Sequence, residues 1–257
     1  MTERNHPMKK PISILICAIL LLALCPFIPA NAEDTIVVEQ IKTGLLGGNC
    51  YILSQGGSAV LVDTGTAQYR DAILQKCREK NVGLIVITHG HYDHTQNAAF
   101  LAEALGVPIA MHPADIPLLT DLHAEPALAH KLLGKLLVWT MKLQQKPVIG
   151  PLLSKAMNNE IPPFTPDIAL DDGFSLEPYG IAAAVTALPG HTRGCVGVLA
   201  GKNLFAGDAL MNMGRPGPAL HYVDRAAMEN SAAKITALGE DVTVWFGHGN
   251  QVKNQAW

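Results

Sequence analysis

Short apolar runs alternate along the chain with stretches in which apolar residues recur at helical spacing. Five of the runs have the length and composition of buried strands: 59–62, 84–88, 181–188, 204–206 and 242–246. Three stretches between them combine helical spacing with capping or terminating residues: 69–80, 96–105 and 224–238. The pattern therefore predicts one domain that mixes helices and strands.

A side chain suited to metal binding follows each of these apolar runs. In chain order the five side chains are Asp63, His89, His191, Asp208 and His248. Strand ends are rigid while the loops after them are free to vary, so a fold can collect distant ligands there. We expect these five loops to meet at one edge of the domain.

One segment, 113–166, carries no strand pattern and is rich in Leu, Lys and Pro, which predicts a helical insertion. Within 127–146 the lysines fall within about 60° of one another on a helical wheel, and apolar residues fill much of the remainder. The lysines are Lys131, Lys135, Lys142 and Lys146, and the apolar residues are Leu132, Leu133, Leu136, Trp139 and Leu143. Such a stripe is typical of a solvated helix face. The alternatives are an apolar lid, which would bury this helix beside the metal site, or a membrane-surface helix that admits acyl substrates.

The N-terminus has the features of a secretory signal peptide. Arg4, Lys9 and Lys10 precede the apolar run 12–24, and Ala-Asn-Ala at 30–32 forms a small-x-small cleavage site. We expect a signal peptide at 1–32, a mature domain at 33–257 and a periplasmic location, with an uncleaved N-terminal membrane anchor as the alternative.

Composition narrows the class of protein further. Of 257 residues, 49% are hydrophobic and 16% are charged, which excludes a disordered chain. The net charge is −3 and no basic block lies outside the first residues, so we expect a small-molecule substrate and no nucleic-acid partner. Three cysteines lie outside the signal segment, and we expect buried, small apolar residues rather than a disulfide at Cys50, Cys77 and Cys195.

The densest cluster of chemistry lies directly after the second apolar run, where residues 88–94 read Thr-His-Gly-His-Tyr-Asp-His. In an extended segment residues i and i+2 point the same way, so His89 and His91 can share one cation. Beyond the bend, Asp93 and His94 can turn toward a second cation. Nitrogen and carboxylate donors without thiolate favour Zn²⁺, with Fe or Mn as alternatives.

These residues resemble the metallo-β-lactamase superfamily, whose His-x-His-x-Asp-His motif is followed by His, Asp and His. Further stretches are similar to that family, namely 49–53, 61–65, 189–192, 205–208 and 247–249. The resemblance implies an αββα sandwich with two metal ions, one held by His89, His91 and His191 and one by Asp93, His94 and His248, with Asp208 bridging. It also implies that Asp63 orients a ligand, while the alternative is a turn carboxylate that accepts from the amides of Thr64 or Gly65.

Two such ions would lower the pKa of a bridging water, so we expect hydrolysis by a metal-bridging hydroxide, with Asp93 as the catalytic residue that holds the water and passes on its proton. An aspartate at position 208, rather than a serine or thiolate, moves the resemblance toward the glyoxalase II and lactonase branches. The expected substrates are small esters, thioesters or lactones. The alternatives are a β-lactam hydrolase, a persulfide dioxygenase with a single iron, and a non-catalytic metal-binding module of the same fold.

Substrate contacts are expected from the Gly- and Pro-rich loop after Asp208. Its candidates are Arg215, His221 and Tyr222. The alternative is a loop that only forms a wall and satisfies its own backbone.

Overall fold

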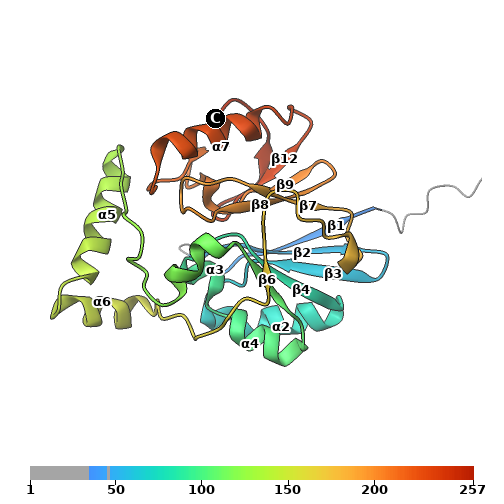
Figure 1. Ribbon diagram of the computed structural model, residues 1–257, viewed down its shortest axis with the longest axis horizontal. Coiled ribbons are helices and arrows are strands. Elements are labelled where there is room, and N and C mark those ends of the chain that lie inside the picture. Colours follow the sequence, from blue (N-terminus) through green and yellow to red (C-terminus); the bar gives the residue numbers. More distant parts are fainter. Residues whose placement is uncertain (1–34, 45–46) are drawn as a thin grey trace, which may run out of the picture. The chain divides into compact units, whose positions relative to one another are not determined.

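Two β-sheets face each other in the computed structural model, which describes residues 35–44 and 47–257 (Figure 1). The first sheet has the strand order β1-β2-β3-β4-β5-β6, with bounds Val37–Ile41, Cys50–Gln55, Ser58–Val62, Val82–Ile87, Ile109–Met111 and Ile168–Ala169. The second has the order β13-β12-β9-β8-β7, with bounds Val252–Lys253, Thr243–Trp245, Asn203–Phe205, Val196–Ala200 and Ala184–Ala187. The predicted signal peptide lies outside the described residues.

Alternation along the strands creates three apolar layers. In β2, Tyr51 and Leu53 point into the core between the sheets, while Ile52 points to the opposite face and packs with the helices. Both faces of the first sheet are therefore buried, which explains why its strands read as continuous apolar runs.

Helices cover the outer faces of both sheets. On the first sheet, α2 (Arg70–Glu79) and α4 (Ala98–Leu105) bury Ile73, Cys77 and Leu101. On the second sheet lies α7 (Arg225–Thr236), whose N-cap Asp224 accepts a hydrogen bond from the Ala227 amide at 3.0 Å. The predicted αββα sandwich is confirmed.

Shorter elements complete the chain. A two-stranded hairpin follows residue 208 and consists of β10 (Leu210–Asn212) and β11 (Pro216–Pro218). The remaining short helices are η2 (Ala67–Tyr69), α3 (Tyr92–Thr95), η3 (Pro113–Leu119), η4 (Glu177–Tyr179) and η5 (Gly207–Ala209). The three helices expected from spacing are present, each shorter than its predicted range because the flanking residues form caps and turns.

The segment 113–166 contains no strand. After η3 it holds two α-helices, α5 (Leu132–Gln144) and α6 (Ile149–Met157), which stand to one side of the sheets (Figure 1). The alternative of an apolar lid, with this helix buried beside the metal site, is contradicted by the exposure of its apolar residues. Leu136 and Trp139 are 53% and 59% exposed, and no residue of α5 or α6 belongs to a buried apolar cluster of the described chain. Sequence spacing identified the helix, but what covers it depends on tertiary structure.

The three cysteines of the described chain are all free and buried, which confirms the expectation of small apolar residues. Burial raises the pKa of the Cys195 thiol well above its ordinary value, so this thiol is not a reactive thiolate. No helix in the described ranges has both the length and the apolar character needed to span a membrane.

Candidate metal centre

Strand direction explains why residues from five loops meet. Strands β3 and β4 are parallel, so Asp63 and His89 emerge at the same edge of the first sheet. In the second sheet β12 is parallel to β9, and β8 is antiparallel to both β9 and β7. The strands β7, β9 and β12 therefore share one direction, and their carboxyl ends deliver His191, Asp208 and His248 to one edge.

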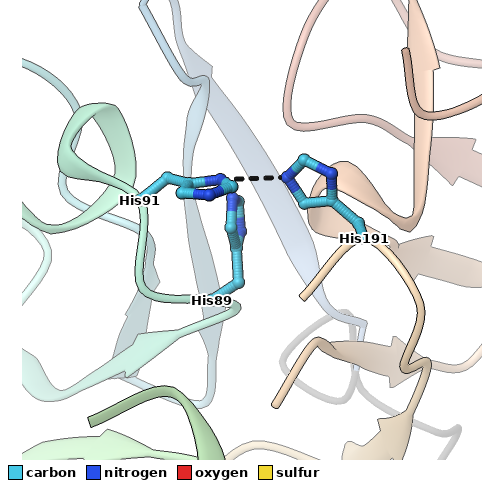
Figure 2. A group of neighbouring side chains, drawn as sticks. All are labelled: His89, His91 and His191. Carbon is cyan, nitrogen blue, oxygen red and sulfur yellow. Dashed lines mark hydrogen bonds between the residues drawn. The ribbon is translucent and has the colours of Figure 1, made fainter. Parts of the chain in front are cut away.

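The first group of candidate ligands is His89, His91 and His191. Figure 2 shows the three imidazoles directed at one another, two from the loop after β4 and one from the loop after β7. One ring nitrogen of each residue lies within 4.8 Å of the other two, and Nδ1 of His91 is 3.0 Å from Nε2 of His191. Three imidazoles this close can bind one cation.

The second group is Asp93, His94 and His248, whose candidate ligand atoms also lie within 4.8 Å of one another. Oδ2 of Asp93 is 3.1 Å from Nε2 of His248 and 3.7 Å from Nε2 of His94. Helix α3 begins at Tyr92, and its turn separates Asp93 and His94 from the extended residues before it, while His248 comes from the loop after β12.

Asp208 lies between the two groups. Its Oδ2 is 3.9 Å from Nε2 of His89 and 3.6 Å from Nε2 of His191, on the side of the first group. The same oxygen is 3.3 Å from Nε2 of His248, and Oδ1 is 3.6 Å from Nε2 of His94. One carboxylate therefore faces imidazoles of both groups, which is the position of a bridging ligand.

A glycine makes room for this carboxylate. A Cβ built on Gly247 would lie 1.9 Å from Oδ1 of Asp208 and 2.9 Å from Cε1 of His94. Any side chain at Gly247 would displace one of these two residues, which explains the glycine directly before His248.

Unpaired buried atoms test whether the residues fit a metal. Nε2 of His89, Nε2 of His94 and Oδ1 of Asp208 are buried without a hydrogen-bond partner. Buried polar atoms rarely lack partners, and all three belong to the candidate ligand groups. Ligand atoms around one tetrahedral Zn²⁺ lie about 3.3 Å apart, close to the separations around Asp208. The residues fit a pair of bound cations.

Electrostatics divides the imidazoles into two kinds. Burial, reinforced by neighbouring imidazoles, lowers the pKa of His89 and His91 well below the ordinary value, so these rings are neutral and can bind metal. Burial opposes protonation of His94 as well, but the carboxylates of Asp63, Asp93 and Asp208 outweigh it and raise its pKa to about 9. A metal at the second group must therefore displace a proton.

Hydrogen bonds from outside the groups fix the ring orientations. Nδ1 of His94 is 2.8 Å from Oδ2 of Asp63, and Nδ1 of His191 is 3.0 Å from the carbonyl of His221. These contacts leave Nε2 of each ring facing the site. Asp63 also accepts hydrogen bonds from the amide and hydroxyl of Thr88, both at 2.8 Å. Asp63 therefore orients a candidate ligand. It accepts no hydrogen bond from the amides of Thr64 or Gly65, which was the alternative.

Two sets of side chains hold the loops of the site in place, and neither was predicted from sequence to do so. Asn49 and Tyr51 donate hydrogen bonds to the carbonyl of Phe246, at 3.0 and 2.5 Å, and so hold the loop that carries His248. Asp115 accepts from the amides of Gly90 and Gly194, at 2.9 and 2.5 Å. Neither role has a local sequence signal, because each donor and acceptor pair is separated by 25 residues or more.

The three predicted substrate residues occupy different environments. His221 is buried, with its ring centroid 4.5 Å from that of His191 and 5.4 Å from that of His91. Tyr222 is buried in a small cluster with Met211, Ala219 and Met228. Arg215 is exposed near the tip of the β10-β11 hairpin. Of the three, only His221 has a ring contact to candidate ligands.

Comparison with known proteins finds sequence relatives that align with most of this chain. An uncharacterised protein of Mycobacterium tuberculosis is 31% identical over 229 residues, which cover 83% of this chain and 91% of the relative. A hydroxyacylglutathione hydrolase of Halorhodospira halophila is 28% identical over 203 residues, which cover 78% of this chain and 60% of that enzyme.

Solved structures and a family model agree on the fold. TTHA1623, solved in a di-iron-bound form, superimposes with a TM-score of 0.61 at 27% identity, covering 84% of this chain and 94% of that one. The B3 metallo-β-lactamase BLEG-1 gives a TM-score of 0.60 at 23% identity with the same coverage, a likeness of fold. The model of the metallo-beta-lactamase superfamily matches residues 43–248, which span all seven candidate ligands. The chain therefore belongs to the metallo-β-lactamase superfamily.

Proposed function

We propose that this protein is a hydrolase with two bound metal ions that acts on small esters, thioesters or lactones. The observation that carries the proposal is the carboxylate of Asp208, within 3.9 Å of imidazoles from two separate groups. The hydroxyacylglutathione hydrolase relative, itself named for a thioesterase activity, supports a bond of this class.

When bound, the metal ions would supply a nucleophile at neutral pH and polarise the carbonyl oxygen of the substrate. The first ion would be held by His89, His91 and His191, the second by Asp93, His94 and His248. Zn²⁺ suits these donors, and the di-iron form of TTHA1623 keeps iron as an alternative.

Asp93 is proposed as the group that moves the proton. Burial would raise the pKa of its carboxyl group, but His94 and His248 outweigh this effect and lower the pKa below the ordinary value. The group is thus ionised at neutral pH and able to accept a proton from the attacking water.

His221 is proposed as a substrate contact. Both of its ring nitrogens are buried and lack a partner, although the ring lies beside those of His91 and His191. Burial, reinforced by His191, lowers its pKa to about 3, so the ring is neutral and offers one donor and one acceptor. A polar group of the substrate would satisfy the donor.

A hydrolysis panel tests the proposal. Metal-replete protein is assayed on lactones, thioesters, aliphatic esters, phosphoesters and β-lactams, together with Asp208→Ala and the matched control His123→Ala. We expect turnover of the first three classes, loss of turnover in Asp208→Ala, and wild-type rates in the control. Turnover confined to β-lactams or to phosphoesters, or the absence of any turnover, would reject the proposal. In a separate assay, persulfide oxidation by protein holding a single iron would reject it in favour of the dioxygenase alternative.

We also propose export. The sequence features of residues 1–32 support signal cleavage and a periplasmic mature protein, and an N-terminal anchor is the alternative.

A further inference from the structure

Most of the exposed large hydrophobic residues of the described chain lie in or beside helices α5 and α6. Twelve large hydrophobic residues are exposed, and nine of them lie between 128 and 157. We call this region the hairpin surface, after the pair of consecutive helices α5 and α6 and not the β10-β11 hairpin. The nine residues are Leu128, Leu132, Leu133, Leu136, Trp139, Val148, Ile149, Leu152 and Met157. Large hydrophobic residues that are exposed together, rather than singly, mark an interaction site.

The charge of the hairpin surface is equally one-sided. The whole chain has 19 Lys and Arg against 22 Asp and Glu, yet residues 126–159 contain five lysines and no carboxylate. All five are exposed, namely Lys131, Lys135, Lys142, Lys146 and Lys155. The partner of this surface should therefore be apolar and negatively charged.

The arrangement around α5 separates three faces. The face that carries Gly134 and Val138 is buried, and Gly134 lies against the carbonyl of Leu220, where a Cβ would come within 2.0 Å of the oxygen. At about 100° per residue, the lysines border this face on one side, and Leu136 and Trp139 follow beyond them. Lysines beside an apolar stripe can reach lipid headgroups while the stripe enters the acyl boundary.

We propose that the hairpin surface docks on an anionic lipid bilayer. A second copy of this chain would bring its own five lysines toward these five, and that repulsion argues against a symmetric dimer through this face. A bilayer with anionic headgroups satisfies both the apolar stripe and the lysines.

Docking would also hold one wall of the metal site near the lipid. Leu128, just before α5, exchanges two backbone hydrogen bonds of 2.9 Å with Tyr222, and α5 itself lies against Leu220. These contacts flank His221 on both sides. The inference does not depend on the proposed hydrolase activity, because lipid binding is measured separately.

Trp139 provides a local reporter in the full chain. The protein is titrated with vesicles of phosphatidylglycerol and phosphatidylcholine, and with phosphatidylcholine alone, while tryptophan emission is recorded. We expect a shift to shorter wavelength with the anionic vesicles only, and its loss in Trp139→Phe, in which Trp245 and Trp257 remain. The wild type and all variants carry the same residues 1–34, so a difference in vesicle binding between them comes from the substituted residues.

Paired lysine variants test the role of charge. Each lysine near an anionic surface strengthens binding about fivefold, so Lys135→Gln with Lys142→Gln should weaken vesicle binding about 25-fold at low salt. The matched control, Lys202→Gln with Lys253→Gln, removes two exposed lysines elsewhere and should bind as the wild type does.

The proposal is overturned if the Trp139 shift is absent with anionic vesicles, equal with neutral ones, or unchanged in the Lys135 and Lys142 pair. A shift that instead follows protein concentration without lipid, with a dimer mass in sedimentation, would assign the surface to a second copy.

Discussion

Asp115 gives the sharpest test of how the metal site is held together. Its buried carboxylate accepts from the Gly90 amide at 2.9 Å, from the Thr192 hydroxyl at 2.6 Å and from the Gly194 amide at 2.5 Å. Gly90 separates two candidate ligands, and Thr192 follows a third. We infer that Asp115 is a positioning residue that fixes one ligand loop against the other.

The structure sets the size of the effect. Asp115→Asn keeps one acceptor oxygen, which can serve Gly194, but its amide nitrogen then faces the Gly90 amide. One buried N–H left unsatisfied costs about 1–3 kcal/mol. Asp115→Ala leaves both amides unsatisfied and should cost about 2–6 kcal/mol. At roughly 2–4 °C per kcal/mol for a domain of this size, the asparagine variant should still fold.

The assay pairs thermal unfolding with zinc titration. Asp115→Asn should lower Tm and also weaken zinc binding roughly 10–100-fold, because loss of a ligand's support loosens the ligand. The control Leu53→Ala removes a buried side chain from the core between the sheets and should cost about 2–5 kcal/mol without changing the zinc affinity of the folded protein. If Asp115→Asn behaves like Leu53→Ala, losing stability but not affinity, the positioning role is refuted.

Four further predictions follow from the site and the N-terminus. Elemental analysis should find two metal equivalents in the loaded protein and close to one in Asp208→Ala, and a wild-type value of one would favour the mononuclear alternative. Zinc binding at pH 7 should release protons. Carboxylates outweigh burial and raise the pKa of His94 to about 9 and that of His248 to about 11, so both rings must deprotonate to bind metal. Calorimetric binding enthalpies that do not vary with the buffer would contradict this prediction. His221→Ala should lower kcat/KM roughly tenfold at unchanged metal content, since the backbone carbonyl that orients His191 is kept, and metal loss would instead make His221 a support of the ligands. Intact-mass spectrometry of the exported protein should find Glu33 at the N-terminus, and a mass that includes Met1 would reject cleavage.

The candidate ligands could be named from sequence because their signal is local. His89, His91, Asp93 and His94 lie within six residues directly after an apolar run, and strand runs also precede His191, Asp208 and His248. The same alternation of apolar runs and helical spacing predicts a mixed α/β domain. Strand burial and metal-ligand chemistry each restrict the residue types within a short stretch, so both can be recognised in a single sequence.

Only the tertiary structure shows which side chains hold these residues in place and which apolar side chains remain exposed. Asp115 and Tyr51 act across 25 residues or more, and such pairs depend on how strands and loops meet rather than on local spacing. The burial of an apolar helix is likewise a property of its neighbours: the spacing of α5 predicted an apolar face, but only the fold shows that Leu136 and Trp139 face solvent. Local patterns determine which elements form, whereas the packing of distant segments determines which side chains are paired, buried or free to bind a partner.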